Sequence, residues 1–102
     1  MKNSFPKKIQ NLSPYSGRFE AFKMESEKCD TFFAYYPAGT EIESHTHDTE
    51  NCGVITKGEL LLKVDGVEKK YSVGEWYHLP ANKEHSARFE VETEEVEFWF
   101  KK

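Results

Sequence analysis

The sequence predicts an all-β domain, either a sandwich or a barrel. Short runs rich in aromatic and β-branched residues recur along the chain, and turn residues separate them. No segment keeps a helical period over three turns, so a β-α-β arrangement is not expected. The 102 residues correspond to one domain. A chain of this size can bury roughly 65% of its unfolded surface, which is enough for one core.

The first residues are expected to form an arm that precedes the barrel. Residues 1–16 contain Pro6, Pro14 and several Asn and Ser residues, and they follow neither the helical nor the strand period. One short strand is expected around Lys8–Leu12. Residues 17–102 then form the single barrel domain.

The first strands of the barrel follow from aromatic and alternating runs. The run 18–26 opens at Gly17, and its aromatic residues favour a strand. The run 30–36 ends at the turn Pro37-Ala38-Gly39. Residues 41–47 alternate around Ile42, and residues 52–56 end at Lys57-Gly58. The inward face of residues 30–36 is one of two sets, Phe33 and Tyr35, or Phe32, Ala34 and Tyr36.

The later strands are separated by clear turns. Asp65-Gly66 is a strong hairpin signal between residues 59–64 and 67–73, because both turn residues tolerate a positive φ. Gly74-Glu75 leads to the short strand 76–79, which Pro80 ends. The last pair of strands covers residues 85–91 and 95–100. The acidic residues 92–97 are expected to be a solvated hairpin.

Charge and composition exclude several classes of function. The net charge is −4, from 14 basic and 18 acidic residues, and the basic residues form no stripe, so nucleic acid is not an expected partner. No apolar run has membrane length, and the N-terminus lacks the apolar stretch of a signal peptide. The expected location is therefore the cytoplasm, where Cys29 and Cys52 should be free thiols.

Three histidines are candidates for a metal site. His45 and His47 are two positions apart on an expected strand, so their side chains should lie on one face. His85 begins a later strand, and a barrel can bring it opposite this pair. Three neutral imidazoles with open positions suit a divalent transition metal such as Zn, Fe, Mn or Ni.

The spacing around these histidines resembles the two motifs of the cupin superfamily. The first motif runs from Gly39 through His45, His47 and Asn51 to Gly58, with five, one, three and six residues between the successive positions. The second runs from Gly74 through Pro80, Asn82 and His85 to Phe89, with five, one, two and three residues between them. The resemblance covers about half of the chain. It implies a double-stranded β-helix, a small jelly-roll barrel with a metal in its mouth.

The sequence departs from the family pattern at three of these positions. Asn51 stands where most cupins have a glutamate ligand, Asn82 where Gly is usual, and Phe89 where Asn is usual. The resemblance implies His45, His47, His85 and Asn51 as metal ligands. Glu50 is the alternative to Asn51, although strand alternation should turn it away. Asn51 can also act only by hydrogen bonding to a ligand imidazole.

Strand alternation predicts which other side chains line the cavity. Gly53 and Ile55 should share the inward face of Asn51, and Ala87 and Phe89 should share that of His85. We expect Gly53 to leave room for a substrate. His78 and Cys52 should point away from the site.

The expected function is that of a metal-dependent enzyme acting on an oxygenated small molecule, of isomerase, lyase or dioxygenase type. The sequence identifies no general acid or base. A non-catalytic cupin that binds or senses a small ligand is therefore the alternative. No nucleic acid or membrane partner is expected. A homodimer is expected, because small cupins commonly pair through an outer sheet face and an N-terminal arm, and aromatic residues make up 15% of the chain.

Overall fold

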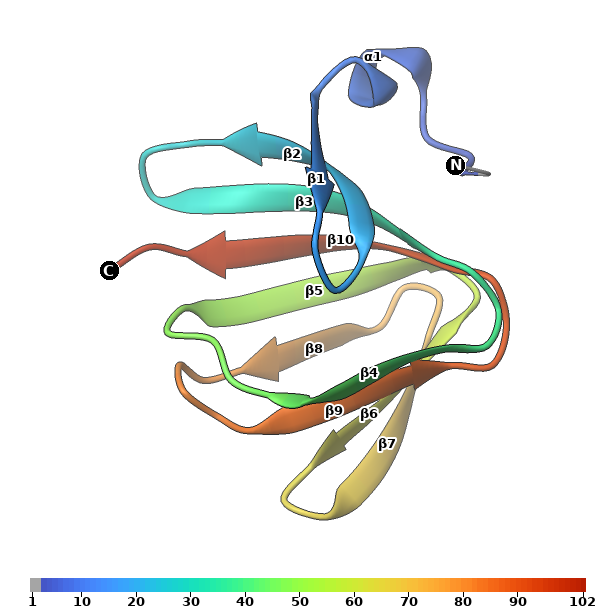
Figure 1. Ribbon diagram of the computed structural model, residues 1–102, viewed down its shortest axis with the longest axis vertical. Coiled ribbons are helices and arrows are strands. Elements are labelled where there is room, and N and C mark those ends of the chain that lie inside the picture. Colours follow the sequence, from blue (N-terminus) through green and yellow to red (C-terminus); the bar gives the residue numbers. More distant parts are fainter. Residues whose placement is uncertain (1–2) are drawn as a thin grey trace.

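Two antiparallel sheets face each other in the computed structural model, which describes residues 3–102 (Figure 1). The larger sheet has the strand order β1-β2-β3-β10-β5-β8, and the smaller has the order β4-β9-β6-β7. The all-β prediction is therefore confirmed. The elements are α1 (Lys7–Gln10), β1 (Ser13–Ser16), β2 (Glu20–Glu25), β3 (Cys29–Tyr36), β4 (Thr40–His45), β5 (Glu50–Lys57), β6 (Glu59–Val64), β7 (Val67–Ser72), β8 (Trp76–Leu79), β9 (His85–Phe89) and β10 (Thr93–Phe100).

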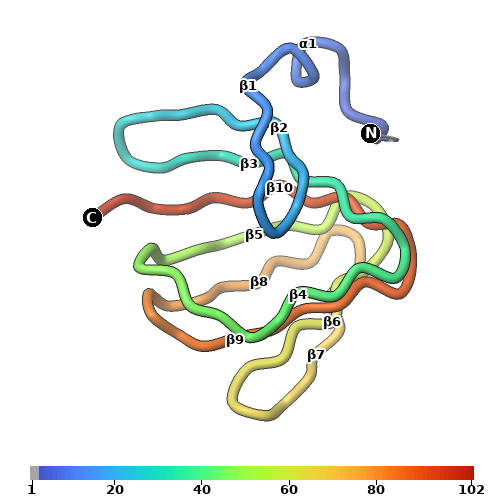
Figure 2. Tube along the Cα trace, viewed as in Figure 1, coloured from blue at the N-terminus to red at the C-terminus, as the bar shows by residue number. Residues whose placement is uncertain are grey.

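The N-terminal segment packs on the chain's own barrel (Figure 2). The strand predicted around Lys8–Leu12 is wrong, because residues 7–10 form a helical turn that follows Pro6, a residue suited to a helix start. The next residues form β1 and pair with β2. The ring of Phe5 lies 6.3 Å from that of Phe22. The buried Glu94 carboxylate accepts hydrogen bonds from the backbone N–H and hydroxyl of Ser4.

Two turns depend on residues with a positive φ. Asp65 and Gly66 have φ values of 53° and 77° and join β6 to β7 as the sequence predicts. Asn82, which replaces the usual glycine of the second motif, has a φ of 64°. Asn is among the few residues other than Gly that tolerate this region, so the loop before β9 keeps its shape.

The interior between the sheets is largely aromatic and aliphatic. The inward set of β3 is Phe32, Ala34 and Tyr36, which join the core cluster. Phe33 lies instead beside Phe5, with ring centroids 6.0 Å apart. The rings of Tyr36 and Phe89 stack at 3.9 Å, one from each sheet, and so fasten the two layers together.

An apolar row crosses the outer face of the six-stranded sheet. Paired residues of neighbouring strands lie on the same face of a sheet, so the register sets this row. Its members are Phe22, Phe33, Val96, Val54 and Trp76. Trp76 is 58% exposed, and its ring stacks on that of Phe98 at 6.1 Å. Within residues 3–102, no helix is long and apolar enough to span a membrane.

Candidate metal centre

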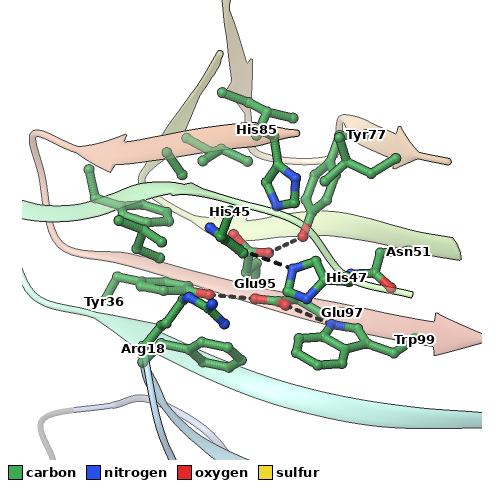
Figure 3. Close-up of a pocket in the computed structure, with 17 residues that line it drawn as sticks. Arg18, Tyr36, His45, His47, Asn51, Tyr77, His85, Glu95, Glu97 and Trp99 are labelled. Carbon is green, nitrogen blue, oxygen red and sulfur yellow. Dashed lines mark hydrogen bonds between the residues drawn. The ribbon is translucent and has the colours of Figure 1, made fainter. Parts of the chain in front are cut away.

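His45, His47 and His85 come together at one mouth of the barrel (Figure 3). One ring nitrogen from each of them lies within 4.8 Å of those of the other two. His45 Nε2 and His47 Nε2 are 3.1 Å apart. Two nitrogens that each lie about 2.1 Å from one ion and meet it at a right angle are about 3.0 Å apart, so this spacing fits a shared metal.

An irregularity in β4 places the first pair. The pairing of β4 with β9 shifts between Ile42 and His45. Strict alternation would send the side chains of Ile42 and His45 to opposite faces of the sheet, but both line the cavity. β4 ends at His45, so His47 lies in the following loop and not on the predicted strand 41–47. The backbone N–H of Asn82 donates a 2.6 Å hydrogen bond to the His47 carbonyl, which ties this loop to the loop before His85.

Backbone carbonyls fix the orientation of two of the imidazoles. His45 Nδ1 lies 2.7 Å from the carbonyl oxygen of Glu43, and His85 Nδ1 lies 2.9 Å from that of Lys83. A carbonyl can only accept, so each Nδ1 carries the proton. The lone pair is then on Nε2, and this hydrogen bond to the opposite ring nitrogen is the usual support of a metal-binding histidine.

The histidines are suited to ligation at neutral pH. Burial, together with the charges of the neighbouring histidines, lowers the pKa of His47 to about 4. Burial also lowers the pKa of His45. Only a neutral imidazole can bind a metal, so neither His45 nor His47 must first lose a proton at pH 7. The donor set of His45, His47 and His85 therefore fits a divalent transition metal.

Asn51 is buried beside the histidines, whereas Glu50 faces outward. Asn51 is 3% exposed and lines the cavity, and its Oδ1 accepts a 2.7 Å hydrogen bond from the Thr49 hydroxyl. Glu50 instead lies 2.6 Å from Nε2 of His78, and both side chains are more than half exposed. The outward direction predicted for Glu50 and His78 is thus confirmed. Metal ligation by Asn51 stays a prediction.

Two buried carboxyl groups line the same cavity, and the sequence analysis did not identify them. Glu95 is 1% exposed and Glu97 is 5% exposed, so the expectation that residues 92–97 form a solvated hairpin is wrong. The Tyr77 hydroxyl donates a 2.5 Å hydrogen bond to Glu95 Oε1. Glu97 accepts hydrogen bonds from the Tyr36 hydroxyl and from Trp99 Nε1. Figure 3 shows Glu95 and Glu97 beside His45 and His47.

Sheet register explains this placement. One inward row runs from Phe32 on β3 through Glu97 on β10 and Gly53 on β5 to Tyr77 on β8. Phenol and indole donors from three strands meet the two carboxyl groups, which is the condition for burying them. The inward set Glu95, Glu97 and Trp99 has a period of two, but Val96 and Phe98 alternate with it, so the alternation alone does not show which face is buried.

In the pair formed by Glu95 and Glu97, the neutral form of Glu95 is favoured. Burial raises the pKa of Glu95 well above its usual range, and the charge of Glu97 and a hydrogen bond with it act in the same direction. Burial and the adjacent glutamates also raise the pKa values of Tyr36 and Tyr77 well above their usual range. Glu95 is therefore the protonated acid of the pair.

The predicted pocket residues divide into two groups. Ala87 and Phe89 line the cavity, as expected. Gly53 and Ile55 face inward but lie outside its lining. The expected space beside Gly53 is absent, because the Tyr77 ring fills it and would overlap an added Cβ. The cavity volume of about 50 Å³ admits a metal ion with a few water molecules or the reacting end of a small substrate.

Cys52 lies on the other face of β5 and takes no part in the cavity. It is a half-buried free thiol, and burial raises its pKa. A raised pKa makes the thiolate scarce at neutral pH, so Cys52 is not an activated nucleophile.

The comparisons with known proteins identify the family. Residues 32–100 match the Cupin domain family, and the chain therefore belongs to the cupins. Curated protein sequences gave no match.

Solved structures share the fold at low sequence identity. An RmlC-like cupin from Shewanella frigidimarina is 17% identical with a TM-score of 0.79, over 97% of this chain and 91% of that one. KdgF from Halomonas sp. is 13% identical with a TM-score of 0.79, over 98% and 95%. A structure of the DMSP lyases RdDddP and RnDddQII is 17% identical with a TM-score of 0.73, over 82% and 48%.

Proposed function

We propose that this chain is a metal-dependent cupin enzyme that transfers a proton on a small oxygenated molecule, as an isomerase or lyase does. The observation that carries the proposal is the buried acid Glu95, which lines the same cavity as the three histidines. The sequence alone offered no general acid or base, and that absence was the main support for a non-catalytic sensor. Glu95 removes this support.

The residues that line the cavity have different roles in the proposed reaction. His45, His47 and His85 would hold the ion, and Asn51 would complete or support its shell. A bound divalent ion would polarise a carbonyl or enediol oxygen and so acidify the adjacent C–H bond. Glu95 gives or takes the proton, because its raised pKa keeps its carboxyl group protonated to a higher pH than that of an ordinary glutamate. Tyr77 and Glu97 fix the orientation of the Glu95 carboxyl group.

The neighbouring folds are compatible with this chemistry. Among them is the structure named for DMSP lyases, and lyase chemistry is one of the two reaction types proposed here. Dioxygenase chemistry at three-histidine iron is the second enzymatic candidate, because the same imidazole set suits iron. Glu95 favours proton transfer, since a buried neutral acid is a ready proton donor.

Exchange of hydrogen for deuterium tests the proposal. Protein loaded with nickel, zinc or manganese is incubated in D2O with small hydroxy and oxo compounds, and NMR follows the protons next to the oxygenated carbon. We expect exchange with wild type and a loss of about 10²- to 10⁴-fold in Glu95→Gln. The metal content of Glu95→Gln should equal that of wild type. Glu27→Gln, an exposed carboxylate, is the matched control.

Two results would contradict the proposal. One is wild-type metal content no higher than that of His45→Ala. The other is full exchange activity in Glu95→Gln. Ligand binding without any exchange or turnover would favour the sensor instead.

A further inference from the structure

Arg18 lies at the rim of the cavity on a loop that aromatic contacts hold in place. The loop joins β1 to β2 and is closed by a 3.1 Å hydrogen bond from the Gly17 N–H to the Phe19 carbonyl. The Phe19 ring lies 5.1 Å from that of Tyr15 and 5.5 Å from that of Tyr36. These contacts pin the loop against the barrel, so Arg18 lines the cavity together with the histidines (Figure 3).

No carboxylate of residues 3–102 pairs with Arg18, although the chain is acidic. Arg88, the other arginine, binds Glu68 through two nitrogens at 2.9 and 2.8 Å and also contacts Glu90. Arg18 is exposed, and it is the only Lys or Arg among the described residues that line the cavity.

The charges of the site favour an anion. The histidines and Asn51 are neutral donors, so a bound divalent ion would keep its charge of two. Arg18 adds one further positive charge at the rim of the cavity. An anionic ligand reduces this excess, and a guanidinium binds a carboxylate with two parallel hydrogen bonds.

The size of the cavity limits how such a ligand enters. A volume of about 50 Å³ holds only a few atoms besides an ion. The oxygenated end of the ligand can enter toward the histidines and Glu95, while another group stays at the rim beside Arg18. Because Arg18 is solvent-exposed, a carboxylate there need not be fully dehydrated.

We propose that the substrate is a small hydroxy- or oxo-carboxylate, with its carboxylate bound by Arg18 at the rim and its oxygenated carbon facing the histidines and Glu95. This inference rests on the proposed function for the role of the inner end. The recognition of the carboxylate by Arg18 is a separate claim and can be measured without turnover.

Calorimetric titration tests the inference on metal-loaded and metal-free protein. The probes are pyruvate, acetoacetate and levulinate, each paired with its neutral methyl ester. We expect at least one acid to bind wild type about tenfold or more tightly than its ester, as a charge-assisted hydrogen bond gives. Arg18→Gln should reduce that preference to less than about threefold, with metal content unchanged. Arg88→Gln should keep the wild-type preference.

Three results would overturn the inference. The first is that the esters bind wild type as tightly as the acids, and the second is that Arg18→Gln keeps the preference for the acid. The third is that no acid binds at 10 mM, a concentration at which dissociation constants above about 1 mM are still detected. Failure of the proposed function looks different, since the protein would then bind no metal or Glu95→Gln would exchange protons normally. The metal-free titration still measures the acid preference in that case. Thermal unfolding of Arg18→Gln checks that the fold is intact.

Discussion

The phenol ring of Tyr77 lies directly over Gly53 and reaches past it to donate its hydroxyl hydrogen bond to Glu95. The two residues are paired across β5 and β8, so the absent side chain of one makes room for the ring of the other. Gly53 therefore affects Glu95 only through Tyr77, the residue that hydrogen-bonds to it. Its role is to admit the tyrosine, and not to leave space for substrate.

The first prediction concerns this pair. Gly53→Ala should lower the free energy of unfolding by about 1–3 kcal/mol, because the added methyl group overpacks the wall under Tyr77. It should also reduce proton transfer, because the displaced phenol no longer holds Glu95. Urea denaturation and the deuterium exchange assay measure the two effects.

A double-mutant cycle provides the control. Tyr77→Leu removes the ring that overlaps the new Cβ, so Gly53→Ala should cost less in that background than in wild type. Equal costs in the two backgrounds would show that Tyr77 is not the residue that excludes a side chain at position 53.

The second prediction is a pH dependence of stability. The folded pKa of Glu95 is raised above its ordinary value of 4.5. Above pH 4.5 the folded state therefore binds more protons than the unfolded state, and the free energy of unfolding falls as the pH rises. Glu95→Gln removes this loss, so its stability relative to wild type should grow between pH 5 and 8, by up to about 1.4 kcal/mol per pH unit.

The comparison is made on metal-free protein by denaturation at several pH values. The lowered pKa values of His45 and His47 act in the opposite direction, since they remove stability as the pH falls below 6.5. They are present in both proteins and cancel in the difference. A difference that stays constant over this range would contradict the raised pKa of Glu95.

The third prediction compares how much the histidines and Asn51 contribute to metal binding. His45→Ala and His85→Ala should each abolish stoichiometric metal binding, because two imidazoles and an amide leave too few donors. Asn51→Ala should weaken binding by about 10- to 100-fold, which is the range for groups that support a ligand shell. Elemental analysis and competition with a chelator measure these changes.

His78→Ala is the matched control for this series. His78 lies on the outer face beside Glu50, so its removal should leave metal content unchanged. Loss of metal in His78→Ala would mean that the ion is bound elsewhere than at the barrel mouth.

The fourth prediction is a homodimer through the apolar row of Phe22, Phe33, Val96, Val54 and Trp76. The row runs over five of the six strands of the larger sheet and is partly exposed, with the Phe5 ring lying against its members Phe22 and Phe33. Trp76→Arg should weaken self-association by at least about tenfold, because large aromatic residues carry much of the energy of such interfaces. Sedimentation velocity at micromolar concentration measures this effect. Val73→Arg is the exposed control, and a monomeric wild type would refute the prediction.

Much of the fold could be predicted from the sequence because turns and alternation act locally. Asp65-Gly66 fixed one hairpin through its positive φ values, and the spacing of the histidines indicated the metal centre. The irregularity between Ile42 and His45 could not be predicted, because it arises from the pairing of β4 with a strand forty residues later in the chain.

The acid pair could not be predicted because burial rules favour the opposite face of β10. Val96 and Phe98 alternate with Glu95 and Glu97, and apolar side chains normally face the core. The glutamates face inward because the hydroxyl groups of Tyr36 and Tyr77, from two other strands, donate hydrogen bonds to them. No local pattern in β10 shows these two partners.

Trp99 gives the cavity a spectroscopic reporter of its own. Its ring lies 4.7 Å from that of His47, and its indole N–H bonds to Glu97. The second tryptophan, Trp76, is on the outer face and 58% exposed. Emission from the sheltered Trp99 should therefore change when a paramagnetic ion or an acid occupies the cavity, while red-shifted emission from Trp76 serves as an internal reference. Occupancy can then be followed by fluorescence without a dye or a known substrate.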